Sequence, residues 1–305
     1  MSAPVATITR VATAFTRGRP GALLSLLVLS VIAVAAFLAP LIAPQDPFDL
    51  ASFDILDSEL PPAWQEGGEA RFPLGTDAQG RDLLSAILYG ARISFMIGIL
   101  AVLIQAAIGV FLGLLAGYFG GRIDSLVTRV ADIQLALSTL MMAIVAMALV
   151  RAGLGGQALS LFAVPLLVII IGLAEWPVFA RTARAAVLVE VTKDYVHAAR
   201  AIGDSDWTIL RRHILPNSLS PLIILATTQV AGAIMAEAAL SFLGLGMPVT
   251  KPSLGTLIRS GYDLMFAGSW WVTVLPGLVL IAVLISINVL GDGLRDWLDR
   301  RRGAH

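Results

Sequence analysis

Long runs of apolar residues without any charge dominate the pattern along the chain. A helix needs about 20 mostly apolar residues to cross the hydrocarbon core of a membrane. Six charge-free runs come close to this length or exceed it: Pro20–Gln45, Ile93–Gly121, Ile133–Val150, Ala152–Ala174, His213–Ala236 and Leu264–Gly291. The pattern therefore predicts an all-α integral membrane protein with six transmembrane helices.

These runs also predict how the chain is organised. The first run is too long for the apolar part of a signal peptide, which spans about 7–15 residues, so we expect an uncleaved helix. The predicted parts are a cytoplasmic amino-terminal segment (1–20), a first transmembrane helix (21–43), an extracytoplasmic acidic segment (44–92), a core with the other five helices (93–292) and a cytoplasmic tail (293–305).

Composition supports the membrane class and excludes several functions. Of the 305 residues, 57% are hydrophobic and 14% are charged, whereas soluble chains carry about a quarter charged residues. The formal net charge is zero, so no basic field favours nucleic acid. Cysteine is absent and the three histidines, His197, His213 and His305, are scattered, so we expect no metal site in this chain.

The lysines argue against a nucleotide site. A phosphate-binding loop needs glycines followed by Lys and Ser or Thr, but Lys193 and Lys251 each follow Val-Thr. Glu237 and Asp132 stand alone and form no catalytic group with other residues. We therefore expect no enzyme activity and no cofactor bound by this chain.

The distribution of basic residues predicts orientation, because Lys and Arg near span ends are retained in the cytoplasm. With the amino terminus inside, 15 of the 21 basic residues lie on the cytoplasmic side. Both termini are therefore predicted to be cytoplasmic. Segment 44–92, with its excess of acidic residues, is then outside; it is either a solvated loop over the helices or a surface that helps to seat an external partner.

Polar and small residues within the runs suggest local roles. Gly109, Gly113 and Gly117 recur every four residues, which favours close helix packing, within the chain or with a second subunit. Asp132 follows Arg129 by three residues, so an ion pair on one helix face is expected. The candidates for lining a pathway are Gln105, Gln229 and Glu237, and Glu237 also has a structural interpretation near the outer end of its span, capping or reaching water.

The connection at 181–216 is unusually long for a link between two spans. It predicts a short helix at Val189–Ala201 that ends at Gly203, and a second helix at Asp206–Leu215, with Pro216 marking the turn into the fifth span. Two interpretations fit this pair of helices: an amphipathic element lying among lipid headgroups, or a docking element for a cytoplasmic protein.

The residues of this connection resemble a known motif. His197-Ala198-Ala199, Gly203 and His213-Ile214-Leu215-Pro216 match in spacing the EAA loop of ABC-type import permeases, although two histidines replace the usual Glu and Ile. Trp207, Leu210 and Ile214 form an apolar stripe beside it. The coupling residues implied by the resemblance and the stripe are His197, Ala198, Ala199, Gly203, Trp207, Leu210, Ile214, Leu215 and Pro216.

Other segments resemble the dipeptide, oligopeptide and nickel branch of these permeases. They include 74–92 before the second span, 237–246 at the end of the fifth, and Pro252-Ser253-Leu254-Gly255, where Leu254 replaces the Trp of the branch. The resemblance implies a type I ABC importer permease in a bacterial inner membrane, surrounded by lipid. It also implies a homologous second permease, two cytoplasmic ATPases that bind ATP and Mg, and an extracytoplasmic solute-binding protein.

Two questions stay open at the level of sequence. A secondary transporter driven by an ion gradient is the alternative class, although such carriers typically show internal repeats and broken helices around their coupling sites. The solute is not determined: peptides lead, and nickel chelates, glutathione, opines and sugars remain candidates.

Overall fold

The structure, a computed structural model, describes residues 20–49, 54–153 and 156–302, and within these ranges every regular element is a helix. The predicted segment 1–20, apart from Pro20, and the last three residues of the predicted tail lie outside the described residues. The elements are α2 (Pro20–Phe37), α3 (Ala39–Ile42), η1 (Ile55–Asp57), α4 (Leu83–Phe119), α5 (Gly121–Leu135), α6 (Thr139–Gly153), α7 (Gly156–Val191), α8 (Asp194–Ile202), α9 (Asp206–Ile209), η2 (Leu210–Ile214), α10 (Leu215–Phe242), α11 (Leu254–Met265) and α12 (Trp271–Arg302).

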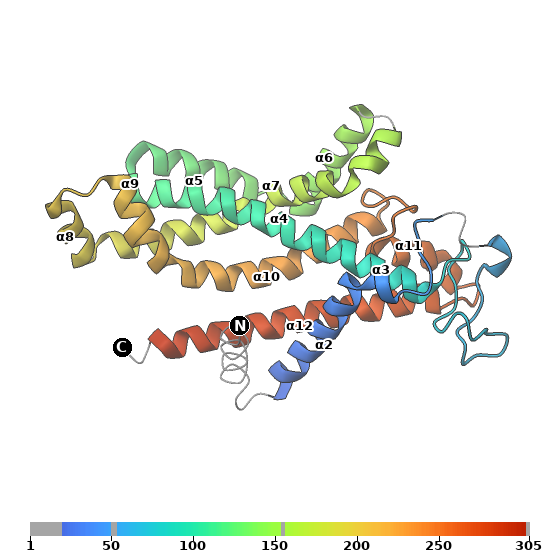
Figure 1. The fold of residues 1–305 in the computed structure, drawn as a ribbon. Helices are drawn as coiled ribbons and strands as arrows, with labels where there is room; N and C mark the ends of the chain where they lie inside the picture. Colours follow the sequence, from blue (N-terminus) through green and yellow to red (C-terminus); the bar gives the residue numbers. More distant parts are fainter. Residues whose placement is uncertain (1–19, 50–53, 154–155, 303–305) are drawn as a thin grey trace.

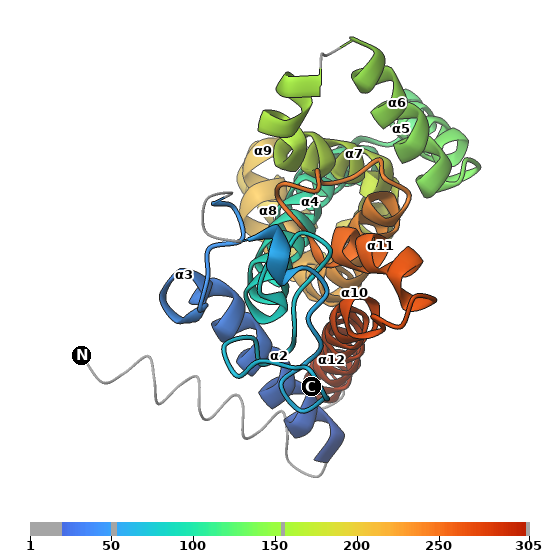
Figure 2. The ribbon, with the colours of Figure 1, turned by 90° about the vertical axis from the view of Figure 1, so that its right-hand side faces the viewer.

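Three long helices form the centre of an elongated bundle. Helix α4 packs most extensively on α7, and α10 packs on both (Figure 1). Helix α12 lies along α10, and α2 packs against α12 and α4. Figure 2 looks along the bundle and shows α6 and α12 on opposite sides of this centre.

The two ends of the bundle carry different elements. Helices α8 and α9 lie at one end, together with the carboxyl end of α12, whereas α3 and α11 lie at the other (Figure 1). We call these the α8–α9 end and the α11 end. Helix α4 begins at Leu83, inside the predicted outer segment 44–92. With 37 residues, α4 is about 55 Å long and exceeds the hydrocarbon core.

Five helices are long and apolar enough to span a membrane, and a bent pair, α5 and α6, makes up to six. Six spans, as predicted, are present when the bent pair is counted as one span. The predicted third span, 133–150, is however not one straight helix. Its helices meet at 87° across residues 136–138. Helix α5 differs from a lipid-facing span because it carries charged residues along its length, and its two aspartates pair with arginines of α7.

Those pairs correct the predicted partner of Asp132. Asp132 Oδ1 lies 2.5 Å from Arg181 Nη2 of α7, and no pair with Arg129 forms within the described chain. Asp124 pairs in the same way with Arg184. The prediction was wrong because it assumed that the fourth span ends near Ala174, whereas α7 continues to Val191 and brings its arginines alongside α5.

The glycine stripe of α4 is an intramolecular contact, as one of the two interpretations proposed. A Cβ on Gly109 would lie 2.4 Å from the carbonyl oxygen of Trp176, and a Cβ on Gly113 would lie 2.4 Å from that of Ala180. On Gly117 it would lie 2.8 Å from Cβ of Val187. All three neighbours belong to α7, so the stripe lets the two helix backbones approach closely.

The predicted connection 181–216 is mostly helical and needs two corrections. The first short helix begins at Asp194 rather than Val189, because residues up to Val191 continue α7. The chain does not turn at Pro216, because α9, η2 and α10 form one helical run over Asp206–Phe242. Proline is accommodated near the start of α10 through a π-helical turn, in which the Leu215 N–H donates to the carbonyl of Leu210.

Candidate functional site

The α8–α9 element has clear start and stop signals. Helix α8 ends at Ile202 and is capped by Gly203, whose φ of 94° lies in the left-handed region that favours glycine. Helix α9 begins at Asp206 and is capped by Ser205, whose hydroxyl accepts a hydrogen bond from the Thr208 N–H. Gly203 therefore reverses the chain between two helices, as the sequence predicted.

Apolar side chains fasten this element to the bundle. Val196 of α8, Ile209 of α9 and the η2 residues Leu210 and Ile214 form a buried cluster with Val187 of α7. The cluster therefore attaches α8, α9 and η2 to the end of α7, and α9 and η2 continue directly into α10.

Polar contacts add a second attachment. Tyr118, near the end of α4, donates its hydroxyl hydrogen to Asp206 Oδ1 over 2.6 Å, and the guanidinium of Arg200 lies 5.4 Å from the centre of its ring. On the other side, the Tyr195 hydroxyl donates to Glu190 Oε2 over 2.5 Å. Burial and this bond to Glu190 raise the pKa of Tyr195 to about 12, so the hydroxyl keeps its proton at neutral pH.

The structure divides the candidate coupling residues into two groups. The buried group holds the element in place and consists of Ala199, Leu210 and Ile214, with Leu215 half-buried. The exposed group consists of His197, Ala198, Gly203, Trp207 and Pro216. The predicted stripe of Trp207, Leu210 and Ile214 is therefore not one exposed face.

What the element exposes is a small apolar tip. The Trp207 residue is 59% exposed and Ile202 is 84% exposed. Sequence analysis did not select Ile202, although an isoleucine directly before the glycine that ends a short helix was a usable signal.

The three candidate pathway residues lie in two places. Gln229 Nε2 donates to Gln105 Oε1 over 3.4 Å, and Gln105 Nε2 donates to the Ile171 carbonyl over 3.3 Å. This pair joins α4, α10 and α7 within the bundle. Gln105 is buried and Gln229 is half-buried, so Gln229 is the member that reaches the surface of this chain.

Glu237 is separate from this pair and is fully buried, with 0% of its surface exposed. One interpretation of the sequence was that Glu237 reaches water, and the structure shows that it does not. Its Oε2 accepts from the Ser94 hydroxyl over 2.8 Å and its Oε1 from the Ser241 hydroxyl over 2.7 Å. Through Ser94, Glu237 therefore ties α10 to α4, whereas Ser241 lies one turn further along α10 itself.

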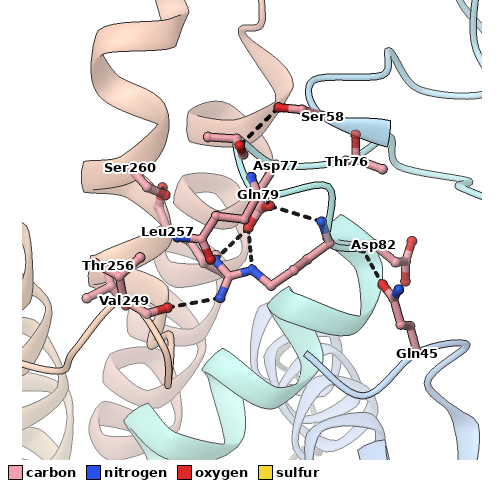
Figure 3. A network of polar contacts seen from close by, with 12 residues as sticks. Gln45, Ser58, Thr76, Asp77, Gln79, Asp82, Val249, Thr256, Leu257 and Ser260 are labelled. Atoms are coloured by element: carbon pink, nitrogen blue, oxygen red, sulfur yellow. Dashed lines mark hydrogen bonds and ion pairs between the residues drawn. The ribbon is translucent and has the colours of Figure 1, made fainter. Parts of the chain in front are cut away.

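A buried ion pair at the α11 end was missed by sequence analysis (Figure 3). Arg81 is 1% exposed, and its Nη2 lies 2.6 Å from Asp77 Oδ2. Its Nη1 also donates to the carbonyl of Val249 over 2.9 Å, across 168 residues of chain. The segment before α4 is thus held to the segment before α11 and is more than a solvated loop.

Asp82 extends the same network toward the first span. It caps α4 by accepting from the Ser85 N–H over 2.8 Å, and its own N–H donates to Gln45 Oε1 over 2.8 Å. Burial raises the pKa of Asp82, against the opposing effect of the hydrogen bonds from Ser85. Gln45 and Asp82 therefore join the end of the α2–α3 segment to the start of α4 (Figure 3).

A third polar group, also missed, lies at the break between α5 and α6. Pro177 of α7 has no N–H, so the carbonyl of Leu173 lacks its usual helical partner. Gln134 Nε2 fills this role over 2.5 Å, and the Thr139 hydroxyl at the start of α6 donates to Glu175 Oε1 over 2.5 Å. The sequence signal for this group was Glu175, a carboxylate that follows a long apolar stretch.

Among the described residues no group of three or more His, Cys, Asp or Glu side chains is arranged to hold a metal ion. The polar groups described above are bonded to neighbouring helices instead of converging on one reacting centre. The bundle therefore carries at one end the α8–α9 element, which is packed on α7 and exposes two large apolar side chains. At the other end its connecting segments are joined by an ion pair and hydrogen bonds.

Such a fold defines a subunit of a membrane transport system. The chain belongs to the family described as the binding-protein-dependent transport system inner membrane component, which matches residues 109–303. Residues 16–62 match the N-terminal transmembrane domain of oligopeptide transport permease C. The chain is therefore a transmembrane permease subunit of an ABC importer and not an enzyme, because ATP hydrolysis belongs to a separate subunit; nothing supports the secondary-transporter alternative.

Several named relatives are similar over most of their length. The di/tripeptide transport system permease protein DppC of Pseudomonas aeruginosa is 42% identical over 92% of this chain and 88% of its own. The dipeptide transport system permease protein DppC of Haemophilus influenzae is 39% identical over 92% and 90%. The glutathione transport system permease protein GsiD of Pectobacterium atrosepticum is 36% identical over 90% and 84%.

A solved structure shares the fold. The MetNI methionine ABC transporter in an inward-facing conformation matches with a TM-score of 0.55 and 18% identity, over 70% of this chain and 96% of that chain. At this identity the match concerns fold alone, and it agrees with the predicted type I importer permease.

The buried pair of Asp77 and Arg81 gives a prediction about stability. Asp77→Leu and Arg81→Met are each expected to lower the free energy of unfolding by about 3–5 kcal/mol, because each leaves a buried charge without its partner. The double variant is expected to lose less than the sum. The measurement is a denaturation series on the purified protein in detergent.

Arg71→Met provides the control, because the partners of Arg71, Asp57 and Glu69, form an exposed group with it. Its denaturation midpoint should stay at the wild-type value. Strictly additive losses for Asp77 and Arg81 would contradict a buried ion pair between them.

Proposed function

We propose that the chain is one of two permease subunits of an importer for short peptides. The observation that carries this proposal is identity of 39–42% over nine-tenths of the chain to permeases named for dipeptides and tripeptides. The glutathione permease, itself named for a peptide-like solute, is consistent with the same class of substrate.

The α8–α9 element is proposed as the docking site for the ATPase subunits. Support comes from the contrast between its two groups of residues: Val196, Ile209 and Ile214 are buried against the spans, whereas Ile202 and Trp207 are exposed. An apolar tip on a fastened element can enter a cleft of a partner and transmit its movement to α7 and α10. His197, Ala198, Gly203 and Pro216 are the other exposed members of this surface.

The remaining partners follow from the family. A homologous second permease completes the translocation pathway, two ATPases bind ATP and Mg at the α8–α9 end, and an extracytoplasmic solute-binding protein delivers solute at the α11 end. We place Gln229, with Gln105 behind it, in the pathway wall. Glu237, bonded to two serines inside the chain, is proposed to act on the pathway through packing.

The α8–α9 end and both termini are proposed to be cytoplasmic. The distribution of basic residues supports this orientation, since Arg181, Arg184, Arg200, Arg211 and Arg212 all lie in or beside the α8–α9 element while the α11 end is acidic. The carboxyl end of α12 lies at the same end of the bundle (Figure 1).

Transport itself is tested with the complete importer in proteoliposomes. Uptake of radiolabelled Ala-Ala delivered by the binding protein should require ATP inside the vesicles. It should be unchanged when an ionophore removes ion gradients, since ATP hydrolysis supplies the energy. Loss of uptake on adding the ionophore, or no uptake of any dipeptide, would contradict the proposed function.

Docking is tested with a matched pair of tryptophans. Trp207→Ala should weaken the affinity of the permease for the ATPase by about thirtyfold or more and so reduce recovery of the ATPase, because truncating an aromatic anchor commonly costs about 2 kcal/mol or more at an interface. Trp64→Ala is the control, since Trp64 is equally exposed at 60% but lies at the α11 end. Equal recovery of ATPase by the two variants would remove Trp207 from the interface.

Orientation is tested with two single cysteines, because the chain has none of its own. Ala70→Cys and Ala201→Cys replace exposed alanines at opposite ends of the bundle. In intact cells an impermeant maleimide should label the first and leave the second unlabelled until the membrane is opened. The reverse pattern would show that the α8–α9 end faces outward.

A further inference from the structure

A cavity of about 400 Å³ lies at the α11 end, between the segment after α10, the carboxyl end of α6 and helix α11. Its lining includes Arg151, Gly244, Arg259 and Asp263. These residues come from two different connections between spans, so the cavity exists only in the folded bundle.

Two guanidinium groups converge on one glycine in this cavity. Arg151 Nη2 donates to the carbonyl of Gly244 over 2.6 Å. Arg259 packs on the other side of the same residue, where a Cβ on Gly244 would lie 1.3 Å from its Nη1. Gly244 also has a φ of 77°, so glycine is needed there both for the backbone and for the space that Arg259 fills.

Neither arginine has an acidic partner within 4.0 Å in the described part of the chain. Asp263 lines the same cavity and lies beyond ion-pair distance of both. Both side chains are exposed, so solvent and salt weaken the repulsion between their charges. A carboxylate suits this place because guanidinium groups bind carboxylates with paired, charge-assisted hydrogen bonds.

Buried groups hold the cavity in shape. The Ser241 hydroxyl donates to Glu237 and accepts from the Met247 N–H over 3.1 Å. This bond closes the segment that carries Gly244 onto the end of α10. Glu237 is thus a positioning residue for the cavity, which links the cavity to the helix that also carries Trp207 at its other end.

We propose that this cavity binds a short peptide as a zwitterion, with its terminal carboxylate between Arg151 and Arg259 and its ammonium toward Asp263. The inference rests on the proposed function and adds a substrate site on the permease itself. A cavity of this size suits a small ligand, and the presence of both charge signs matches a free peptide better than it matches an acidic protein surface.

The test compares Ala-Ala with alanyl-alaninamide, which lacks the carboxylate, in the complete reconstituted importer. The double variant Arg151→Gln, Arg259→Gln is expected to lower kcat/KM for uptake of Ala-Ala by about tenfold or more. For alanyl-alaninamide the same variant should stay within about twofold of wild type, because that compound cannot make the lost contacts. Any effect of the amide on the binding protein is the same for both permeases and cancels in this comparison.

Lys251→Gln is the matched control, since Lys251 is an exposed cation on the same connection as Gly244 and does not line the cavity. It should leave uptake of both compounds unchanged. Uptake of alanyl-alaninamide by the double variant also shows that the variant importer is assembled.

Equal loss of uptake for both compounds would overturn the proposal, and would mean that the arginines contact an acidic group of the binding protein instead. A wild-type importer that takes up neither compound would contradict the proposed function itself. The two failures are therefore distinguishable.

Discussion

The close approach of α4 and α7 is the contact on which the rest of the bundle depends. In lipid, helices are held together by dispersion and polar bonds more than by exclusion from water, so the distance between backbones matters. Gly109, Gly113 and Gly117 add no side chain of α4 to this contact, so the backbone of α4 lies directly against α7. Helix α7 continues to Val191, and Val187 near its end packs on the α8–α9 element.

One continuous helical run connects the two functional ends. It covers Asp206–Phe242, with Trp207 exposed at one end and Ser241 bonded to Glu237 at the other. The same helical run therefore joins the proposed docking site to the proposed peptide cavity. The π-helical turn at Leu210–Ile214 lies close to the docking end, where such turns often accompany functional sites.

The polar groups at the α11 end fix the relative positions of the connecting segments more than they add to the free energy of unfolding. A buried ion pair repays its desolvation only in part, yet Arg81 bonded to Asp77 and to the Val249 carbonyl allows one relative position of two distant segments. These contacts hold together the surface on which a solute-binding protein is proposed to act. Arg151 and Arg259 contrast with this network, because both lie at Gly244 and neither has an acidic partner among the residues that the structure describes.

The sequence by itself determined the class of protein, the apolar spans, the role of Gly203 in reversing the chain and the close packing of the α4 glycines, because these depend on local composition and spacing. The tertiary structure decided which side chains pair with one another and which are buried. Asp132 pairs with Arg181 and not with Arg129, and Leu210 and Ile214 are buried while Trp207 is exposed. Arg81 reaches Val249 across 168 residues. Such choices depend on which helix faces lie together in space, and no local pattern specifies that.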